Sequence, residues 1–448
     1  MACKWIYTVL SIITTFLCFV STNFPHQIAA VESDPTDCTN RWIHIRRLPT
    51  YFNLDLLSNC SEYPLYDNFC PFLANHGLGR KTHNRSRSWY RTDPLLLELT
   101  FHRRMLEYPC LTADPVDANA IYLPYYAAID AVRYLYGPEY NNSAEQGLEL
   151  YDFLKHDNPW IWKRHGGHDH FLMMARPAWD FSQEVDADPR LWGTSFLKLP
   201  AFYNVTALIV EARTWPWQEQ AVPFLTSFHP PNLALLESWI RRVSNSRRSS
   251  LMLFAGGGGV AANPNIRRSI RDECENSSNV DLVNRGGYYT KMCDIVDCSN
   301  GICEHDPIRY MRPMLQSTFC LQPPGDTPTR RSTFDAIVAG CIPVFFELVS
   351  AKTQYTWHLP EELYEEFSVF IQKEDVVFKG LRIMDVLRRI PKARVRKMRE
   401  KVIELMPRII YRRHESSLGL RSRMDAFDIA VEGTLQRIGS RISGGLDQ

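Results

Sequence analysis

The chain has 448 residues, which is more than a single hydrophobic core usually supports, so two globular domains are expected. Hydrophobic residues make up 45% of the chain and charged residues 23%, as in an ordinary folded protein. The net charge of +1 argues against a large surface for nucleic acid or another polyanion.

An uncharged segment of sixteen residues begins at Trp5, and as a helix it would span about 24 Å, enough for a thin bilayer. Lys4 precedes it and the next basic residue is Arg41, so the residues after the segment are expected to cross the membrane. We interpret residues 5–22 as a retained signal anchor. The alternative is a cleaved signal peptide that ends near Ala30.

Both interpretations place the rest of the chain in the secretory pathway, and two further features agree with this. Ten of the twelve cysteines lie beyond the apolar segment, an even number that suits disulfides in an oxidising compartment, although their pairing does not follow from the sequence. Sequons for N-glycosylation occur at Asn59, Asn84, Asn141, Asn204 and Asn276.

The first half of the remaining chain mixes strands and helices. Residues 93–106 have helical spacing, with Pro94 in the first turn. The proline-rich segment 228–232 has no apolar period and is predicted to be a hinge. Short apolar runs predict strands at 42–45, 120–124 and 207–210.

In the second half, apolar strands and helices alternate, which predicts a parallel sheet with helices on both faces. Ligands of such sheets bind beyond the carboxyl ends of the strands. The segment from 391 to about 438 is predicted to be mostly helical. The predicted strands are 251–255, 319–321 and 342–346, and the predicted helices are 235–243, 266–274 and 329–339.

The segment from Phe319 to Phe346 combines features that suit an anion. A helix start presents N–H groups and partial positive charge. Arg330 and Arg331 add forked donors for phosphate oxygens, and Asp335 could accept hydrogen bonds from ribose hydroxyls. A nucleoside diphosphate is the predicted ligand. A capped helix with exposed arginines is the alternative, and composition alone favours neither.

Four consecutive glycines, Gly256 to Gly259, follow the strand at 251–255, and such a loop lets backbone approach a phosphate closely. Arg267, on the next predicted helix, is a candidate phosphate partner. A surface turn is the alternative interpretation. The phosphate-loop motif of kinases and ATPases does not occur here.

The histidines of the segment His165-Gly-Gly-His168-Asp-His170 lack the one-face helical spacing of zinc motifs, so we expect a general base or a substrate hydrogen bond, with structural packing as the alternative. No apolar strand precedes the only Asp-x-Asp pair, Asp186 and Asp188, which we interpret as a turn. No metal site is predicted. The tryptophans of this region suit either sugar faces or a core, and they are Trp160, Trp162, Trp179, Trp192, Trp215 and Trp217.

The stretch FCLQPPGD…TRRSTFDAIVAGCIPVFF, with TQYTWHLP after it, closely resembles the exostosin-type glycosyltransferases of family 47, and within them the plant xyloglucan galactosyltransferase-like clade. Further matching motifs are LPTYFNLDLL, GHDHF, VPFLTSFHP, LMLFAG and IRRSIRDEC, in the same order. The resemblance covers residues from about 41 to 437.

The resemblance implies an α/β GT-B architecture, with two Rossmann-like domains that face a cleft, preceded by a single N-terminal membrane anchor. The implied divisions are a cytoplasmic tail (1–4), a signal anchor (5–22), a stem (23–40), an N-terminal acceptor-side domain (41–230), a C-terminal UDP-sugar-binding domain (231–390), and C-terminal helices and tail (391–448).

Site residues are also implied by the resemblance. Asp169 and His170 match the DHF element in the family's cleft, and we expect one of them to be the general base. The donor-binding stretch matches at Gly325, Arg330, Arg331, Ser332 and Asp335, to which the reasoning above adds Gly256 and Arg267. The clade's own signature falls on Gln354, Tyr355, Trp357 and His358, expected at the acceptor or cleft.

The activity implied is inverting transfer of galactose from UDP-galactose to xylosyl side chains of xyloglucan, without a metal or cofactor. Gly259 stands where many relatives have an arginine, so UDP-galacturonate or UDP-arabinose are alternative donors, and a non-catalytic lumenal partner is a second alternative. A type II Golgi membrane location is implied, and association with other Golgi transferases is a further expectation.

Overall fold

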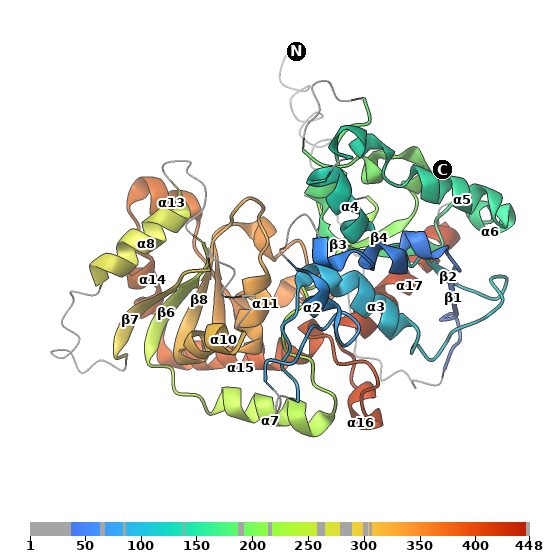
Figure 1. Ribbon diagram of the computed structural model, residues 1–448. Helices are drawn as coiled ribbons and strands as arrows, with labels where there is room; N and C mark the ends of the chain where they lie inside the picture. The colour runs from blue at the N-terminus through green and yellow to red at the C-terminus, as the bar shows by residue number, and fades with distance from the viewer. Residues whose placement is uncertain are drawn as a thin grey trace, which may run out of the picture. The chain divides into compact units, whose positions relative to one another are not determined.

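The computed structural model describes residues 37–62, 68–83, 87–137, 139–186, 192–213, 217–257, 265–277, 289–298, 303 and 307–444. Cys38–Gln448 form one compact unit that contains two parallel five-stranded sheets. The mixed α/β fold class is therefore confirmed (Figure 1).

The first sheet has the strand order β1-β2-β3-β4-β5, and every neighbouring pair is parallel. β3 was not predicted, because the sequence HFLMMARP was not recognised as a strand, yet seven of its eight residues are buried. The strands are β1 (Ile43–Ile45), β2 (Ala120–Tyr122), β3 (His170–Pro177), β4 (Thr206–Glu211) and β5 (Glu219–Ala221).

The second sheet has the order β10-β9-β8-β6-β7. The three strands predicted in this half correspond to β6, β8 and β9, which are apolar and buried because the sheet is covered by helices. The strands are β6 (Ser250–Ala255), β7 (Lys291–Val296), β8 (Ser317–Gln322), β9 (Ile342–Phe345) and β10 (Val369–Phe370).

Helices cover both faces of the first sheet, with α4 on one side of β3 and β4 and α3 and α17 on the other (Figure 1). The α-helices are α2 (Cys70–Leu73), α3 (Leu97–Met105), α4 (Ala127–Leu135), α5 (Leu148–His156), α6 (Pro159–Lys163), α7 (Leu233–Ser244), α8 (Ile266–Ser277), α10 (Pro307–Gln316), α11 (Arg331–Val338), α12 (Tyr364–Phe367), α13 (Lys373–Lys379), α14 (Ile383–Arg389), α15 (Lys392–Ile409), α16 (Leu418–Arg421) and α17 (Ala426–Gly444).

The proline-rich segment 228–232, predicted to be a hinge, is bound to residues before and after it in the chain, and its role as a hinge stays a prediction. His229 is fully buried, and its backbone N–H donates to the Ser88 carbonyl oxygen at 2.7 Å. Its imidazole Nδ1 lies 2.7 Å from the carbonyl oxygen of Tyr411, and Nε2 lies 3.1 Å from the Thr92 hydroxyl. Burial lowers the pKa of His229 to about 4, so the ring stays neutral.

The C-terminal residues return to the first sheet after α15 has packed beside α11 and β9. α17 packs against β4, where Arg441 Nη1 donates to the Thr206 hydroxyl at 3.2 Å. Arg437 Nη1 donates to the Glu219 carbonyl oxygen at 3.1 Å. The helices predicted after residue 391 are confirmed, and they join the two halves of the fold.

Within the described ranges, no helix is both long and apolar enough to cross a membrane. The predicted signal anchor at 5–22 lies outside the described residues.

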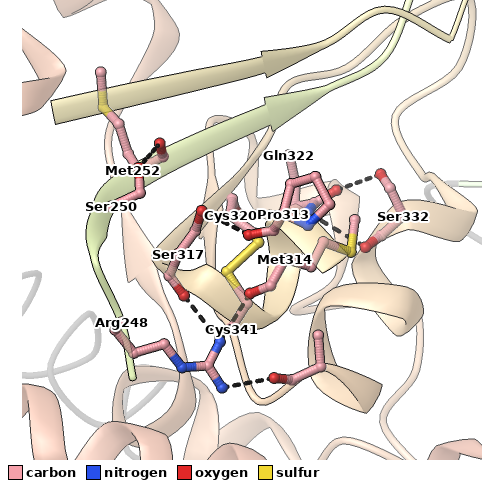
Figure 2. Close-up of a disulfide and its surroundings, with 11 residues drawn as sticks. Arg248, Ser250, Met252, Pro313, Met314, Ser317, Cys320, Gln322, Ser332 and Cys341 are labelled. Carbon is pink, nitrogen blue, oxygen red and sulfur yellow. Dashed lines mark hydrogen bonds between the residues drawn. A yellow bond between two sulfur atoms is a disulfide. The ribbon is translucent and has the colours of Figure 1, made fainter. Parts of the chain in front are cut away.

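All ten cysteines beyond the apolar segment form disulfides, which the even count favoured. Figure 2 shows the bond between Cys320 in β8 and Cys341 just before β9, which closes the segment that contains α11. Arg248 lies beside it and donates to the carbonyl oxygens of Met314 at 2.8 Å and Ser317 at 3.0 Å. The other pairs are Cys38–Cys110, Cys60–Cys70, Cys274–Cys293 and Cys298–Cys303.

A buried ion cluster fixes the start of α17 to α3. Arg104 Nη1 lies 2.6 Å from Asp425 Oδ2, and its Nη2 lies 3.4 Å from Asp428 Oδ1. Burial alone would raise the pKa of Asp425, but the guanidiniums of Arg104 and Arg412 more than offset this and hold the pKa below its ordinary range. The carboxylate is therefore charged at neutral pH and depends on its two arginines.

We expect Arg104→Met to lower the free energy of unfolding by about 3–5 kcal/mol, because it leaves two buried carboxyl groups short of one compensating charge. Denaturant unfolding measures this. Lys155→Met is the matched control, since Lys155 pairs with Asp152 at 3.3 Å on the surface. That variant should change stability by less than about 1 kcal/mol. Equal changes in the free energy of unfolding for the two variants would show that the buried cluster contributes little to stability.

Candidate functional site

A cavity of about 450 Å³ opens beyond the carboxyl ends of the second sheet, where ligands of parallel sheets bind. The loop between β8 and α11 forms one wall, with Pro324 and Gly325, and Arg267 of α8 lies beside it. Lys373 and Phe378 of α13 contribute to the opposite lining. The cavity therefore lies at the edge of the sheet at which the sequence predicted a ligand.

Two guanidinium groups converge on Gly325. A Cβ atom at this position would collide with the guanidinium of Arg330 and would lie 2.5 Å from Arg267 Nη2. The absence of a side chain at Gly325 thus allows both cations to approach the loop backbone. Three residues named from the sequence as donor-binding are brought together here.

In the described part of the chain, the guanidiniums of Arg267 and Arg330 donate to uncharged carbonyl and hydroxyl oxygens. Arg267 Nε donates to Pro324 O at 3.0 Å, and Arg330 Nη1 donates to Thr329 O at 2.6 Å and Thr327 Oγ1 at 3.1 Å. Burial, followed by the charge of Arg267, lowers the pKa of Arg330 to about 10. The carboxylates of Glu211 and Asp326 oppose this shift of the pKa, and a bound anion would offset it further, so the geometry suits a phosphate group.

The glycine loop contacts Arg267, which lines this cavity. Gly257 O accepts a hydrogen bond from Arg267 Nη1 at 3.3 Å, and Gly256 O accepts one from Arg271 Nη2 at 3.2 Å. Gly258 and Gly259 lie outside the described residues. The backbone of the loop thus helps to hold Arg267 near Gly325.

The Exostosin GT47 domain matches residues 37–387, which include both sheets and this cavity. The chain belongs to the exostosin GT47 family. The resemblance stated from the sequence is confirmed.

Among the relatives of this GT47 protein is the Arabidopsis thaliana protein named "Probable xyloglucan galactosyltransferase GT19", which is 67% identical over 416 residues, 93% of this chain and 94% of the relative. The Arabidopsis thaliana "Xyloglucan galactosyltransferase MUR3" is 37% identical over 422 residues, 93% of this chain and 65% of the relative. "Xyloglucan galactosyltransferase XLT2" of the same plant is 35% identical over 408 residues, 89% and 75% of the two chains.

Arg331 does not join Arg330 and Arg267, although it follows Arg330 directly. Its Nη1 donates to Thr92 O at 2.8 Å and its Nη2 to the Ser227 hydroxyl at 2.7 Å, so it ties the GT47 donor loop to the first half of the fold. Asp335 is buried and lies 3.4 Å from Arg331 Nε. Burial raises the pKa of Asp335 to about 6, although the charge of Arg331 opposes this.

Helix α11 begins at Arg331, two residues later than predicted, because Thr329 is held by a residue of the first sheet. Glu211, at the carboxyl end of β4, accepts a hydrogen bond from the Thr329 N–H at 2.8 Å and another from its hydroxyl. Ser332, in the first turn, donates to Gln322 Oε1 at 2.5 Å. Donor-binding roles for Ser332 and Arg331, and a ribose-binding role for Asp335, stay predictions.

Glu347 and Lys373 also line the cavity, and sequence reasoning missed both. They form an ion pair with each other. Glu347 follows β9 closely, and a carboxylate just beyond a buried parallel strand is a signal that could have identified it. Phe378 at the rim is 72% exposed, which offers an aromatic face to the cavity.

The placement of Asp169 and His170 does not support either as the general base of this site. Asp169 Oδ1 lies 2.7 Å from His170 Nδ1, and Oδ2 accepts from Arg164 Nε at 2.5 Å, all at the amino end of β3. At about 3.3 Å per residue, β3 puts roughly 25 Å between Asp169 and the carboxyl end of the sheet at Pro177. The histidine-rich motif is therefore at the opposite edge of the first sheet from Glu211, which contacts the loop between β8 and α11.

The four signature residues lie in the junction of the two halves. Gln354 pairs with Ala212 through both amide atoms, at 2.9 and 3.0 Å. Tyr355 and His358 are fully buried, and the Tyr355 hydroxyl donates to Val210 O at 2.9 Å. The ring of Trp357 packs against α17. The structure places these side chains in contacts that join the halves, and a role in acceptor binding stays a prediction.

In the described part of the chain, no group of three or more His, Cys, Asp or Glu side chains could hold a metal ion. Asp188 of the Asp-x-Asp pair lies outside the described residues. That activity needs no metal stays a prediction.

Three of the sequon asparagines, Asn59, Asn141 and Asn276, are exposed. Asn204 is half-buried, and its Nδ2 donates to a backbone carbonyl at 3.0 Å. Asn84 lies outside the described residues. Glycosylation at these positions stays a prediction.

We expect Gly325→Ala to weaken UDP binding about tenfold or more while the fold is kept. The new methyl group meets the ends of two flexible side chains, so the guanidiniums of Arg267 and Arg330 must move and their bonds to a diphosphate are lost. Calorimetric titration measures the UDP affinity, and thermal unfolding shows whether the fold is kept. Gly439→Ala is the control, because nothing lies within 4 Å of its Cβ position. Wild-type UDP affinity in Gly325→Ala would contradict the diphosphate site.

Glu211 and Thr329 should act as one unit in positioning the donor loop. Glu211→Gln and Thr329→Val each remove part of the same contact, so each is expected to weaken UDP binding, and the double variant should be little worse than either single one. The UDP affinities of all four proteins, measured by titration, give the coupling. Additive effects would show that Glu211 acts independently of Thr329.

Proposed function

We propose that this GT47 protein transfers galactose from UDP-galactose to xylosyl side chains of xyloglucan, in a GT-B arrangement with the nucleotide sugar in the second half. Three relatives that share 35–67% of their aligned residues with this chain carry names of xyloglucan galactosyltransferases. The observation that carries the donor assignment is the pair of guanidiniums, Arg267 and Arg330, around Gly325 at the cavity.

In an inverting transfer, a xylosyl hydroxyl oxygen attacks the anomeric carbon of galactose while the bond to the β-phosphate oxygen breaks. The bonding electrons leave with UDP, and the hydroxyl proton passes to a base. Arg267, Arg330 and the N-terminus of α11 supply positive charge where the phosphate gathers negative charge, and each oriented donor contributes a few kcal/mol. These groups are the basis for proposing that the reaction runs without a divalent metal.

A type II Golgi membrane protein with its catalytic part in the lumen is the proposed setting. The five disulfides support an oxidising compartment. The uncharged segment at 5–22, preceded by Lys4, supports a retained anchor with a cytoplasmic N-terminus.

The test is UDP release by the full chain in detergent, with UDP-galactose, UDP-galacturonate or UDP-arabinose, with and without xyloglucan oligosaccharides and EDTA. We expect acceptor-dependent release from UDP-galactose that EDTA does not reduce. Arg267→Met should lower kcat about 100-fold or more, because it removes one cation from the leaving group. Arg268→Met is the matched control, since it changes the next residue of the same helix, whose side chain is 62% exposed.

If UDP is released from UDP-galacturonate or UDP-arabinose instead, that sugar replaces galactose in the proposal. If folded protein releases no UDP from any of the three donors, a role as a non-catalytic lumenal partner is favoured. Equal losses in Arg267→Met and Arg268→Met would contradict the role of Arg267 at the diphosphate.

A further inference from the structure

The structure divides the tryptophans of the first half into buried and exposed ones. Trp162 is only 9% exposed and belongs to the core, while Trp160, Trp179 and Trp217 are 45%, 62% and 62% exposed. Trp215 lies outside the described residues. A single exposed indole is common on a protein surface, so exposure alone does not identify a binding residue, and position must distinguish the three.

Position in the sheet separates the three exposed tryptophans. Trp160 in α6 precedes β3, and Trp217 precedes β5, so both lie toward the amino ends of the strands. Trp179 follows β3 directly, in the short 3-10 helix Ala178–Phe181. It therefore lies at the carboxyl edge, the edge that faces the donor loop through Glu211.

The distance from Trp179 to the donor loop is bounded by the strand register. Pro177 of β3 pairs with Glu211 of β4, and neighbouring strands are about 5 Å apart. Two further residues reach at most about 7 Å, so the Cα atoms of Trp179 and Glu211 lie within roughly 12 Å. Since Glu211 holds Thr329, next to Arg330, a molecule lying on Trp179 is close to the proposed donor.

Among the described residues, two close neighbours of Trp179 in the chain, Arg176 and Asp180, form a hydrogen-bonded ion pair. Arg176 Nε donates to Asp180 Oδ2 at 2.6 Å, and Trp192 Nε1 donates to Asp180 Oδ1 at 2.7 Å. Arg176 Nη2 also donates to the hydroxyl of Tyr136 at 3.2 Å. The Arg176–Asp180 ion pair is internally neutral, and the Tyr136 side chain beside it is 43% exposed.

We propose that Trp179, with Tyr136 beside the Arg176–Asp180 pair, binds the neutral sugar rings of the acceptor polysaccharide. The C–H face of a pyranose ring is apolar and packs on an indole, while its hydroxyls need polar neighbours such as Tyr136. The neutral ion pair disfavours an acidic polymer. The inference rests on the proposed transfer to a glycan and adds the surface that holds the acceptor next to the donor.

The experiment compares Trp179→Ala, Trp179→Phe and Trp217→Ala in the full chain. Trp217 has the same 62% exposure at the opposite edge and is the matched control. For the acceptor, KM with xyloglucan oligosaccharides is measured, and affinity electrophoresis in gels with xyloglucan, glucomannan or xylan gives a readout that needs no turnover. For the donor and the fold, UDP affinity and Tm are measured.

We expect Trp179→Ala to raise the acceptor KM about tenfold or more and to lose retardation in the gel, with UDP affinity and Tm unchanged. Trp179→Phe should keep part of the binding, and Trp217→Ala should behave as wild type. Equal acceptor binding by Trp179→Ala and Trp217→Ala would overturn the inference, as would a wild-type protein that no gel retards. Retardation of the protein that depends on Trp179, without any galactose transfer, would support Trp179 as a sugar-binding residue and reject the proposed activity.

Discussion

The candidate site depends on one constraint, which is the close approach of two guanidinium groups to the same glycine, Gly325. Arg267 and Arg330 come from different helix–loop units, and both would be displaced by any side chain at Gly325. Like charges repel, and burial opposes charging, which lowers the pKa of Arg330. A fold keeps such an arrangement only where other contacts enforce it. The ligand that would relieve it is an anion, and this links the electrostatics of the loop to its function.

The enforcing contacts come largely from the first half of the fold. Glu211 binds Thr329 immediately before Arg330, and Arg331 immediately after it is bound to Thr92 and Ser227. The donor loop is therefore anchored on both sides of Arg330 by residues that are more than 100 positions away in the chain. Beneath it, the Cys320–Cys341 disulfide joins β8 to the start of β9. The candidate donor site belongs to the second sheet, but its shape depends on both halves.

Features that depend on local sequence pattern were predicted, whereas features that depend on contacts with distant residues were not. Continuous apolar runs located β6, β8 and β9, and the loop after β8, which was expected to face a ligand, lines a cavity. Arg330 and Arg331 look equivalent in sequence, yet only Arg330 lies against Gly325 of the cavity wall, because Arg331 is bound to Thr92 and Ser227 in the first half. The histidine motif lies at the amino end of β3, and its catalytic role stays a prediction. Had HFLMMARP been recognised as a parallel strand, Asp169 would have been assigned to its amino end, away from ligands.

The same junction determines how donor and acceptor can meet. Gln354 satisfies both backbone groups of Ala212 just beyond β4, and Tyr355 binds the carbonyl of Val210, so separating the halves would leave several buried polar groups unpaired. Each such group costs about 1–3 kcal/mol, which makes wide opening of this junction expensive. In the proposed function, a polysaccharide would then approach at the carboxyl end of β3, which Trp179 follows, rather than between separating halves. Trp179 lies on that edge, which makes its exposed ring a fixed point from which an acceptor hydroxyl can be presented to the bound sugar nucleotide.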